Sequence, residues 1–132
     1  MSAAAPGRER AGLEPFEYAL IRVVPRVERG EAINAGVILY SHQHRFLDCL
    51  FLLNENRLRV LDPAADVAAV RAALAGLGAG CRGGRPAEEP LGVRFRWLTA
   101  PRSTIVQPGP VHSGLTADPA AELARLFDEL VR

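Results

Sequence analysis

Three consecutive runs of β-branched, aromatic and aliphatic residues constrain the fold of this chain more than any other feature. They span residues 17–27, 32–41 and 46–53, and short polar segments separate them. Runs of this composition joined by short polar turns predict neighbouring antiparallel strands. Apolar residues occur at both odd and even positions, so the sequence predicts a meander of three strands with both faces largely covered.

Two residues within these runs require a specific explanation. Gly36 stands in the middle of the second run, where glycine weakens a strand unless a bulge or a close neighbour requires the missing side chain. Arg22 is flanked by core positions of the first run, and a buried arginine without a partner would cost several kcal/mol. We therefore expect Arg22 to meet an acid, backbone carbonyls or a ligand.

The sequence predicts two main helices after the meander. Asp62-Pro63 is a helix-start signal, an apolar stripe at helical spacing follows it, and glycines are expected to end this first helix. Asp118-Pro119 repeats the start signal before a second stripe that runs to about Val131. A short helical turn is expected around Leu58 and Leu61. The apolar stripe of the first helix consists of Val67, Val70, Leu74 and Leu77, and the glycines expected to end it are Gly76, Gly78 and Gly80. The apolar stripe of the second helix consists of Leu123, Leu126, Phe127 and Leu130.

The segment between the two helices is expected to add a loop and two short strands. Residues 78–92 are rich in Gly, Arg, Pro and Glu, which predicts a mobile loop within the domain, chiefly over 83–89. Three apolar residues then alternate with two arginines over 93–97, which predicts a half-exposed strand with Arg94 and Arg96 on its outer face. Ser103 to Gln107 is the candidate for another short strand.

Together these elements predict an α+β fold, with an antiparallel sheet of about four to five strands and two main helices packed on it. The 132 residues are 48% hydrophobic, which is ordinary for one globular domain. We expect a single domain over residues 16–132, preceded by a disordered tail over 1–15.

Charge and composition exclude several classes of function. Lys+Arg 16 against Asp+Glu 15 leaves a net charge of +1, so we do not expect nucleic acid as a partner. No apolar segment has the length of a signal peptide core or a membrane span, and we expect no membrane association and a cytoplasmic location. Cys49 and Cys81 are expected to be reduced and not to pair, and without zinc-site spacing the sequence predicts no metal and no cofactor.

A candidate polar site lies in the proline-rich stretch from Trp97 to Thr116, which concentrates hydrogen-bonding side chains without an obvious structural role. We expect these side chains to converge on one concave patch that binds a phosphate or carboxylate, together with one residue of the first hairpin. The alternative is a loop that satisfies its own hydrogen bonds. The candidate residues are Arg102, Ser103, Thr104, Gln107, His112 and Ser113, with Arg22 or Asn34 from the hairpin.

Catalytic and metal-binding alternatives are less well supported by the sequence. A serine nucleophile needs a base and an oxyanion hole, and the G-x-S-x-G turn is absent; Ser103 with His112 and Asp118 is geometrically possible but has no other support. His42 and His44 could offer two nitrogens to a metal, with His112 as a third ligand, although a polar hairpin tip explains the first two histidines more simply.

Two phrases of the sequence resemble a known family. They are Tyr18-Ala-Leu-Ile-Arg-Val-Val-Pro-Arg-Val-Glu-Arg-Gly-Glu-Ala-Ile-Asn-Ala-Gly-Val-Ile-Leu and Trp97-Leu-Thr-Ala-Pro-Arg-Ser-Thr, the latter followed by Gln107 and Val111-His-Ser-Gly-Leu-Thr. In this order and spacing the chain resembles an uncharacterised bacterial family, domain of unknown function three thousand and thirty-seven. Ala32 stands where the family pattern suggests a bulkier residue. The resemblance implies no activity; what it implies is an expectation about partners, namely that genes for HipA-like kinases accompany some members.

Two classes of function follow. Because no complete catalytic constellation can be identified, the first is a small partner-binding or regulatory accessory protein rather than an enzyme, and the resemblance suggests a HipA-like kinase as a neighbour. The second is an enzyme or binding module for an anionic small molecule or nucleotide at the Arg102/His112 patch.

Overall fold

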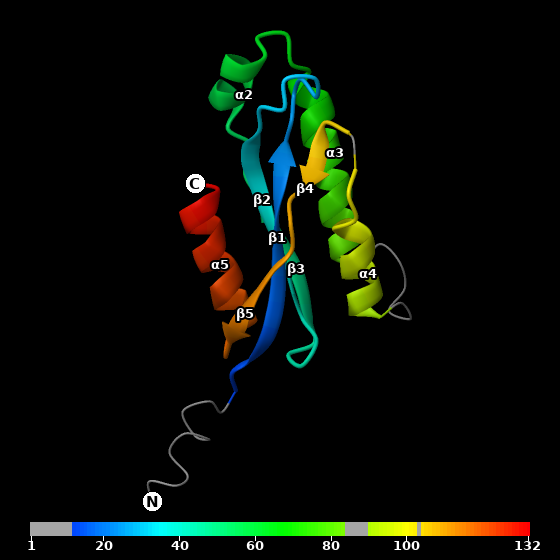
Figure 1. The fold of residues 1–132 in the computed structure, drawn as a ribbon, viewed down its shortest axis with the longest axis vertical. Helices are drawn as coiled ribbons and strands as arrows, with labels where there is room; N and C mark the ends of the chain where they lie inside the picture. The colour runs from blue at the N-terminus through cyan, green and yellow to red at the C-terminus, as the bar shows by residue number, and fades with distance from the viewer. Residues whose placement is uncertain (1–11, 84–89, 103) are drawn as a thin grey trace, which may run out of the picture.

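A computed structural model of the chain describes residues 12–83, 90–102 and 104–132. Its centre is a five-stranded antiparallel sheet, in which β1 (Glu14–Val23), β2 (Ile33–Ser41) and β3 (Phe46–Phe51) form the predicted meander. The other edge of β1 pairs with two short strands, β4 (Val106–Pro108) and β5 (His112–Thr116). The α+β fold and the number of strands predicted from the sequence are confirmed (Figure 1).

Helices cover both faces of the sheet, so that the described part of the chain has two hydrophobic cores. On one face lie α3 (Val67–Cys81) and α4 (Leu91–Leu98), with the short α2 (Glu55–Leu61) near one end of the sheet; α5 (Pro119–Leu130) covers the other face (Figure 1). Alternate residues of β2 enter opposite cores: Ile38 and Tyr40 face the α3 side, and Val37 and Leu39 face α5. The sheet is therefore the middle of three layers.

A β-bulge in the first hairpin accounts for the glycine in β2. The register between the two strands shifts from Ile21↔Gly36 to Arg22↔Asn34, which inserts an extra residue on β2. A Cβ atom at Gly36 would also lie 2.9 Å from the carbonyl oxygen of Leu50 and would overlap a neighbouring aromatic ring. Both reasons that the sequence suggested for a glycine here, a bulge and a close neighbour, are present.

The first strand begins and ends earlier than predicted. Glu14 and Pro15 belong to β1 rather than to the predicted tail, because β5 supplies a partner for them, as in the pair Glu14↔Thr116. Residues 1–11 lie outside the described residues. The strand ends at Val23, before Pro25. The hairpin end that follows carries two ion pairs, Arg26 with Glu28 at 3.6 Å and Arg29 with Glu31 at 2.6 Å.

The start of α3 was predicted wrongly at Asp62-Pro63. The N-cap is Asp66, whose side chain accepts a hydrogen bond from the backbone N–H of Ala69 at 3.0 Å. The Asp62 carboxylate instead accepts from the N–H of Ala64 at 3.0 Å, in the turn after α2. Both aspartates satisfy free backbone donors, but only the second has a continuous apolar stripe behind it.

The glycines at 76–80 do not end α3, which runs through them to Cys81. A Cβ at Gly78 would lie 3.4 Å from the ring of Phe51, and one at Gly80 would lie 3.3 Å from Leu98. These glycines allow α3 to pack closely against β3 and α4. The loop predicted over 78–92 is therefore helical at both ends, and residues 84–89 of its predicted mobile part, 83–89, lie outside the described residues.

The strand predicted over 93–97 is wrong, because this segment is the helix α4. Its buried residues are Arg94, Phe95 and Leu98, whereas Val93 and Trp97 are exposed by 55% and 64%. The alternation of apolar residues with arginines suggested a strand, but the buried positions recur at helical spacing. The strand predicted over Ser103–Gln107 is displaced as well, since β4 spans Val106–Pro108.

Candidate functional site

The structure brings together three of the residues predicted to form an anion site. Arg22, Arg102 and Gln107 line a cavity of about 300 Å³ beside the end of the first hairpin. Arg22 lies opposite Gln107 in the register of β1 and β4, and its guanidinium would lie 3.3 Å from a Cβ placed at Gly109.

Most hydrogen-bonding groups of this cluster already have partners within their own loop. The Arg102 guanidinium donates to the carbonyl of Trp97 at 2.9 Å and stacks over the indole ring at 4.9 Å. The Gln107 amide donates to the carbonyl of Thr104 at 2.7 Å, and the Thr104 hydroxyl donates to the carbonyl of Val106 at 2.8 Å. These contacts correspond to the alternative of a self-satisfied loop.

The remaining predicted residues lie elsewhere. His112 and Ser113 are exposed on β5 beside Tyr18 and Glu17, and the His112 ring lies 5.3 Å from that of Tyr18. The Asn34 amide donates to the carbonyl of Leu130 at 3.0 Å, next to α5. Ser103 lies outside the described residues. The described candidates therefore do not converge on one patch.

The alternatives built on histidines find no shared site among the described residues. His42 contacts the Tyr40 hydroxyl at 3.3 Å, and His44 contacts the carbonyl of Thr116 at 2.9 Å. Asp118, considered as a partner for His112, is the N-cap of α5 and accepts from the N–H of Ala121 at 3.1 Å.

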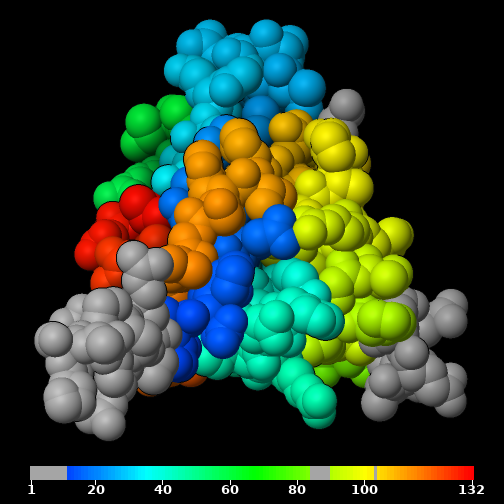
Figure 2. Space-filling model, turned by 60° about the horizontal axis from the view of Figure 1, so that its bottom comes forward, coloured from blue at the N-terminus to red at the C-terminus, as the bar shows by residue number. Residues whose placement is uncertain are grey.

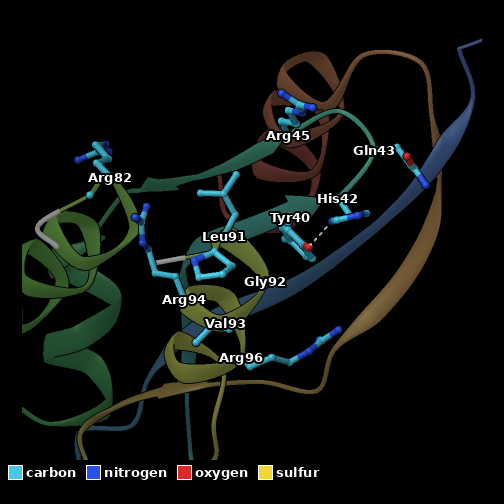
Figure 3. A pocket seen from close by; sticks show the side chains of 12 residues that line it. Tyr40, His42, Gln43, Arg45, Arg82, Leu91, Gly92, Val93, Arg94 and Arg96 are labelled. Atoms are coloured by element: carbon cyan, nitrogen blue, oxygen red, sulfur yellow. Dashed lines mark hydrogen bonds between the residues drawn. The ribbon is translucent and has the colours of Figure 1, made fainter. Parts of the chain in front are cut away.

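A larger cleft, which the sequence did not reveal, lies between the β2–β3 turn and α4. These two segments meet on one face of the molecule (Figure 2), and the cleft between them has a volume of about 1040 Å³. In Figure 3 the side chains of Arg82 and Arg94 lie at one end, and those of His42, Gln43 and Arg45 lie at the other. Four arginines line it: Arg45, Arg82, Arg94 and Arg96.

An aromatic ring and a helix backbone form the floor of this cleft. Tyr40 stacks on Phe95 with 5.3 Å between ring centroids. A Cβ at Gly92 would lie 2.8 Å from the Tyr40 hydroxyl oxygen, so a larger residue there would displace the hydroxyl. Gly92 thereby allows the first turn of α4 to lie directly against Tyr40, between the two groups of basic side chains.

Two of the four arginines have acidic partners. Arg96 donates to both carboxylate oxygens of Glu17, at 2.9 and 2.7 Å, and this hydrogen-bonded carboxylate raises the pKa of Arg96 above its usual value. Arg82 lies 3.6 Å from the carboxylate of Asp48. The charge of these two arginines is therefore partly balanced before any ligand binds.

The other two arginines have no carboxylate partner among residues 12–83, 90–102 and 104–132. Arg94 is only 8% exposed and donates from one terminal nitrogen to the carbonyl of Cys81 at 3.3 Å. Its Nε atom is buried and has no hydrogen-bond partner within the part of the chain that the structure describes. Arg45 has a positive φ of 51° in the β2–β3 turn, a conformation that few non-glycine residues adopt. Arg94 thus carries a buried charge that the described residues do not neutralise.

The N-terminus of α4 adds to this positive potential. Asn54, Asp66 and Asp118 cap α2, α3 and α5 with side-chain hydrogen bonds, whereas the N-cap of α4 is Pro90, which makes no such bond, and its first turn contains no acid. Free N–H groups and the helix dipole favour an anion at such an end. Pro90, Leu91 and Gly92 line the cleft.

The sequence contained one usable signal for this cleft. Leu91, Arg94, Phe95 and Leu98 are spaced as one face of a helix, but counting Arg94 as polar and outward-facing broke the pattern. A helix assignment would have placed Arg94 on the buried face and raised the question of its partner. The role of Arg45 in the turn had no comparable signal.

These features define a class: a small α+β domain with helices on both faces of an antiparallel sheet and a cleft lined by arginines. Within the described ranges, no helix combines the length and hydropathy needed to cross a membrane. The family model "Protein of unknown function (DUF3037)" matches residues 18–131. The chain belongs to this family, which is the one numbered three thousand and thirty-seven that the two sequence phrases resemble. No curated protein and no solved structure is significantly similar to the chain.

Proposed function

We propose that the protein binds an anionic small molecule through a phosphate group in the cleft between the β2–β3 turn and α4. Arg94 is the observation that carries the proposal. A buried guanidinium without a compensating charge is costly, and a phosphate placed against Arg94 and the first turn of α4 would remove that cost. The proposal keeps the anion-binding class predicted from the sequence but moves it from the Arg102/His112 patch to this cleft.

The cleft offers the groups that phosphate recognition uses. Arginine binds phosphate through several parallel N–H donors, and Arg45 and Arg94 reach the cleft from opposite ends (Figure 3). The N–H groups of the first turn of α4 lie between them, and Tyr40 and Leu91 provide apolar surface for the rest of the molecule. The volume of the cleft, about 1040 Å³, is close to the upper limit of the range typical of small-molecule sites.

Titration with inorganic pyrophosphate tests the proposal. We expect binding by calorimetry and a rise in Tm that weakens at high salt, since a ligand at 100 times its Kd adds about 2.7 kcal/mol to the free energy of unfolding. Arg45→Ala and Arg94→Met should each weaken binding at least tenfold, the latter keeping most of the side-chain volume. Arg57→Ala, which removes an exposed charge on α2, is the matched control and should bind like the wild type.

Two results would contradict the proposal. One is wild-type protein that does not bind pyrophosphate at low salt, and the other is unchanged binding in Arg45→Ala together with Arg94→Met. If Arg94→Met does not fold, Arg45→Ala still tests the proposal. We expect this variant to fold, because Arg45 is a turn residue with no ion pair among the described residues. A parallel titration with citrate separates phosphate recognition from general attraction of anions.

A protein partner remains the second candidate. Val93 and Trp97 are exposed on the outer side of α4, and aromatic residues of this kind are enriched in protein interfaces. The prediction of an accessory role beside a HipA-like kinase stays a prediction. Co-purification of such a kinase from the native host, lost in Trp97→Ala and kept in Arg45→Ala, would support it; equal recovery with both variants would count against this surface.

A further inference from the structure

Two cysteines that are far apart in the sequence lie against each other in the α3-side core. Cys49 belongs to β3 and Cys81 is the last residue of α3, and their side chains are 0% and 1% exposed. Both are free thiols. The two sulfur atoms and one carboxylate oxygen of Asp48 all lie within 4.8 Å of one another. The sequence predicted only that these cysteines would not pair and gave no sign that they are neighbours.

The Arg82 guanidinium lies beside this cluster. It donates to the carbonyl of Cys49 at 3.4 Å and lies 3.6 Å from the Asp48 carboxylate. A thiolate is the form of cysteine that binds a metal, and a neighbouring positive charge of this kind favours a thiolate over a thiol.

We propose that Asp48, Cys49 and Cys81 form a binding site for a thiophilic divalent cation of the zinc type. Two sulfur ligands on tetrahedral zinc lie about 3.8 Å apart, given Zn–S bonds of about 2.3 Å. The present limit of 4.8 Å therefore requires a contraction of at most about 1 Å. The site is independent of the proposed anion cleft, although Arg82 borders both.

The Asp48 carboxylate is placed to serve as the third ligand. Its Oδ1 atom accepts the N–H of Cys49 at 2.8 Å and lies 3.6 Å from the Arg82 guanidinium. Both contacts use the same oxygen, so Oδ2 can turn toward the ion. The Asp48 side chain is 43% exposed, which gives an entry route from solvent to the two buried sulfurs.

The charges of the site balance when a divalent cation is present. Two thiolates and one carboxylate carry three negative charges, the ion carries two positive charges, and Arg82 supplies the remaining one. Without a metal, a second thiolate beside the first would be unfavourable in this buried position. Metal binding would thus release protons from the pair, and its affinity should rise with pH.

Cadmium and zinc titrations of the reduced, metal-stripped full chain test the proposal. Cadmium should produce an ultraviolet sulfur-to-metal charge-transfer band that saturates at one equivalent, and zinc should displace it. Cys49→Ser and Cys81→Ser should each remove the band, and Asp48→Asn should weaken binding at least tenfold. His112→Ala, which removes an exposed potential ligand elsewhere, is the matched control and should bind like the wild type.

Thiol labelling keeps the test decisive if the serine variants fail to fold. One equivalent of zinc should then protect both cysteines of the wild-type protein from iodoacetamide under conditions that label them in its absence. The proposal is overturned if cadmium gives no band, if metal binding survives the loss of either cysteine, or if the thiols form a disulfide under mild oxidation and bind no metal when reduced.

Discussion

Truncation of Phe95 and of Trp97 should have very different effects on stability, because α4 buries one ring and exposes the other. Phe95 is fully buried, and its ring packs against Tyr40. Replacing such a residue by alanine costs about 3–5 kcal/mol through lost burial and the cavity left behind. The Trp97 side chain is 64% exposed and stacks with Arg102, an exposed contact worth about 0.5–1 kcal/mol. We therefore expect Trp97→Ala to cost less than about 1 kcal/mol.

Equilibrium unfolding in urea, followed by circular dichroism, measures this difference. With a slope of about 2 kcal/mol per molar urea, Phe95→Ala should lower the midpoint by roughly 1.5–2.5 M and Trp97→Ala by less than about 0.5 M. Phe95→Leu, which restores part of the volume, should fall between the alanine variant and the wild type. Val93→Ala, at another exposed position of α4, should behave like Trp97→Ala.

A strand over 93–97 would give a different pattern of stability losses, since Val93, Phe95 and Trp97 would share one buried face. Comparable losses for all three alanine variants would refute the helix and the cleft built on it. Total stabilities are typically about 5–15 kcal/mol. If Phe95→Ala leaves too little folded protein to measure, the comparison of Phe95→Leu with Trp97→Leu gives the same test.

Two further predictions concern the sheet and its ion pairs. Gly36→Ala should destabilise the protein by about 1–3 kcal/mol, since the new Cβ meets the Leu50 carbonyl and a core ring. Gly76→Ala on α3, where a Cβ would have no described atom within 4 Å, should instead stabilise the protein by about 0.5–1 kcal/mol; thermal melts that rank the two variants the other way would contradict the packing at the bulge. Glu17→Gln should cost less than about 1 kcal/mol, because its partner Arg96 is largely exposed, and the difference from wild type should shrink in 1 M NaCl; a loss that persists in salt would show that the pair has another role.

The meander and the last helix could be predicted from the sequence because their signals are local. Three apolar runs with short turns leave few arrangements other than neighbouring antiparallel strands, and Asp118-Pro119 followed by an apolar stripe gives α5 nearly to the residue. Asp62-Pro63 carries the same start signal and is only a turn. Capping chemistry therefore marks free backbone donors and does not by itself identify a helix.

The features that depend on long-range contacts could not be predicted. Whether Arg94 is a surface charge or a buried one depends on the packing of α4 against Tyr40, which no local pattern encodes. The contact between Cys49 and Cys81 depends on where α3 crosses β3; in the sequence Cys49 lies in an apolar run and Cys81 in a glycine-rich segment, and these settings argued against pairing. The predicted patch failed to assemble for a similar reason: β4 and β5 pair with different parts of β1, so Gln107, opposite Arg22, and His112, opposite Tyr18, lie at different places along that strand.

The pairing of β1 also makes folding depend on the order in which the strands are synthesised. One edge of β1 pairs with β2 within the first hairpin. The other edge can pair with β5 only after β5 has been synthesised, because Thr116 of β5 pairs with Glu14, about a hundred residues earlier in the chain. Such non-local contacts form late and slowly. At ribosomal rates of about 5–20 residues per second, roughly 5–20 s separate the synthesis of the two strands.

During that interval the nascent chain carries an apolar strand with an open edge, which is a template for pairing with other chains. The sheet face that α5 covers stays exposed even longer, because Phe16, Val37 and Leu39 pack against that helix. Aggregation of newly made protein, rather than unfolding of the mature domain, should therefore be the main failure of variants that weaken β5 or α5.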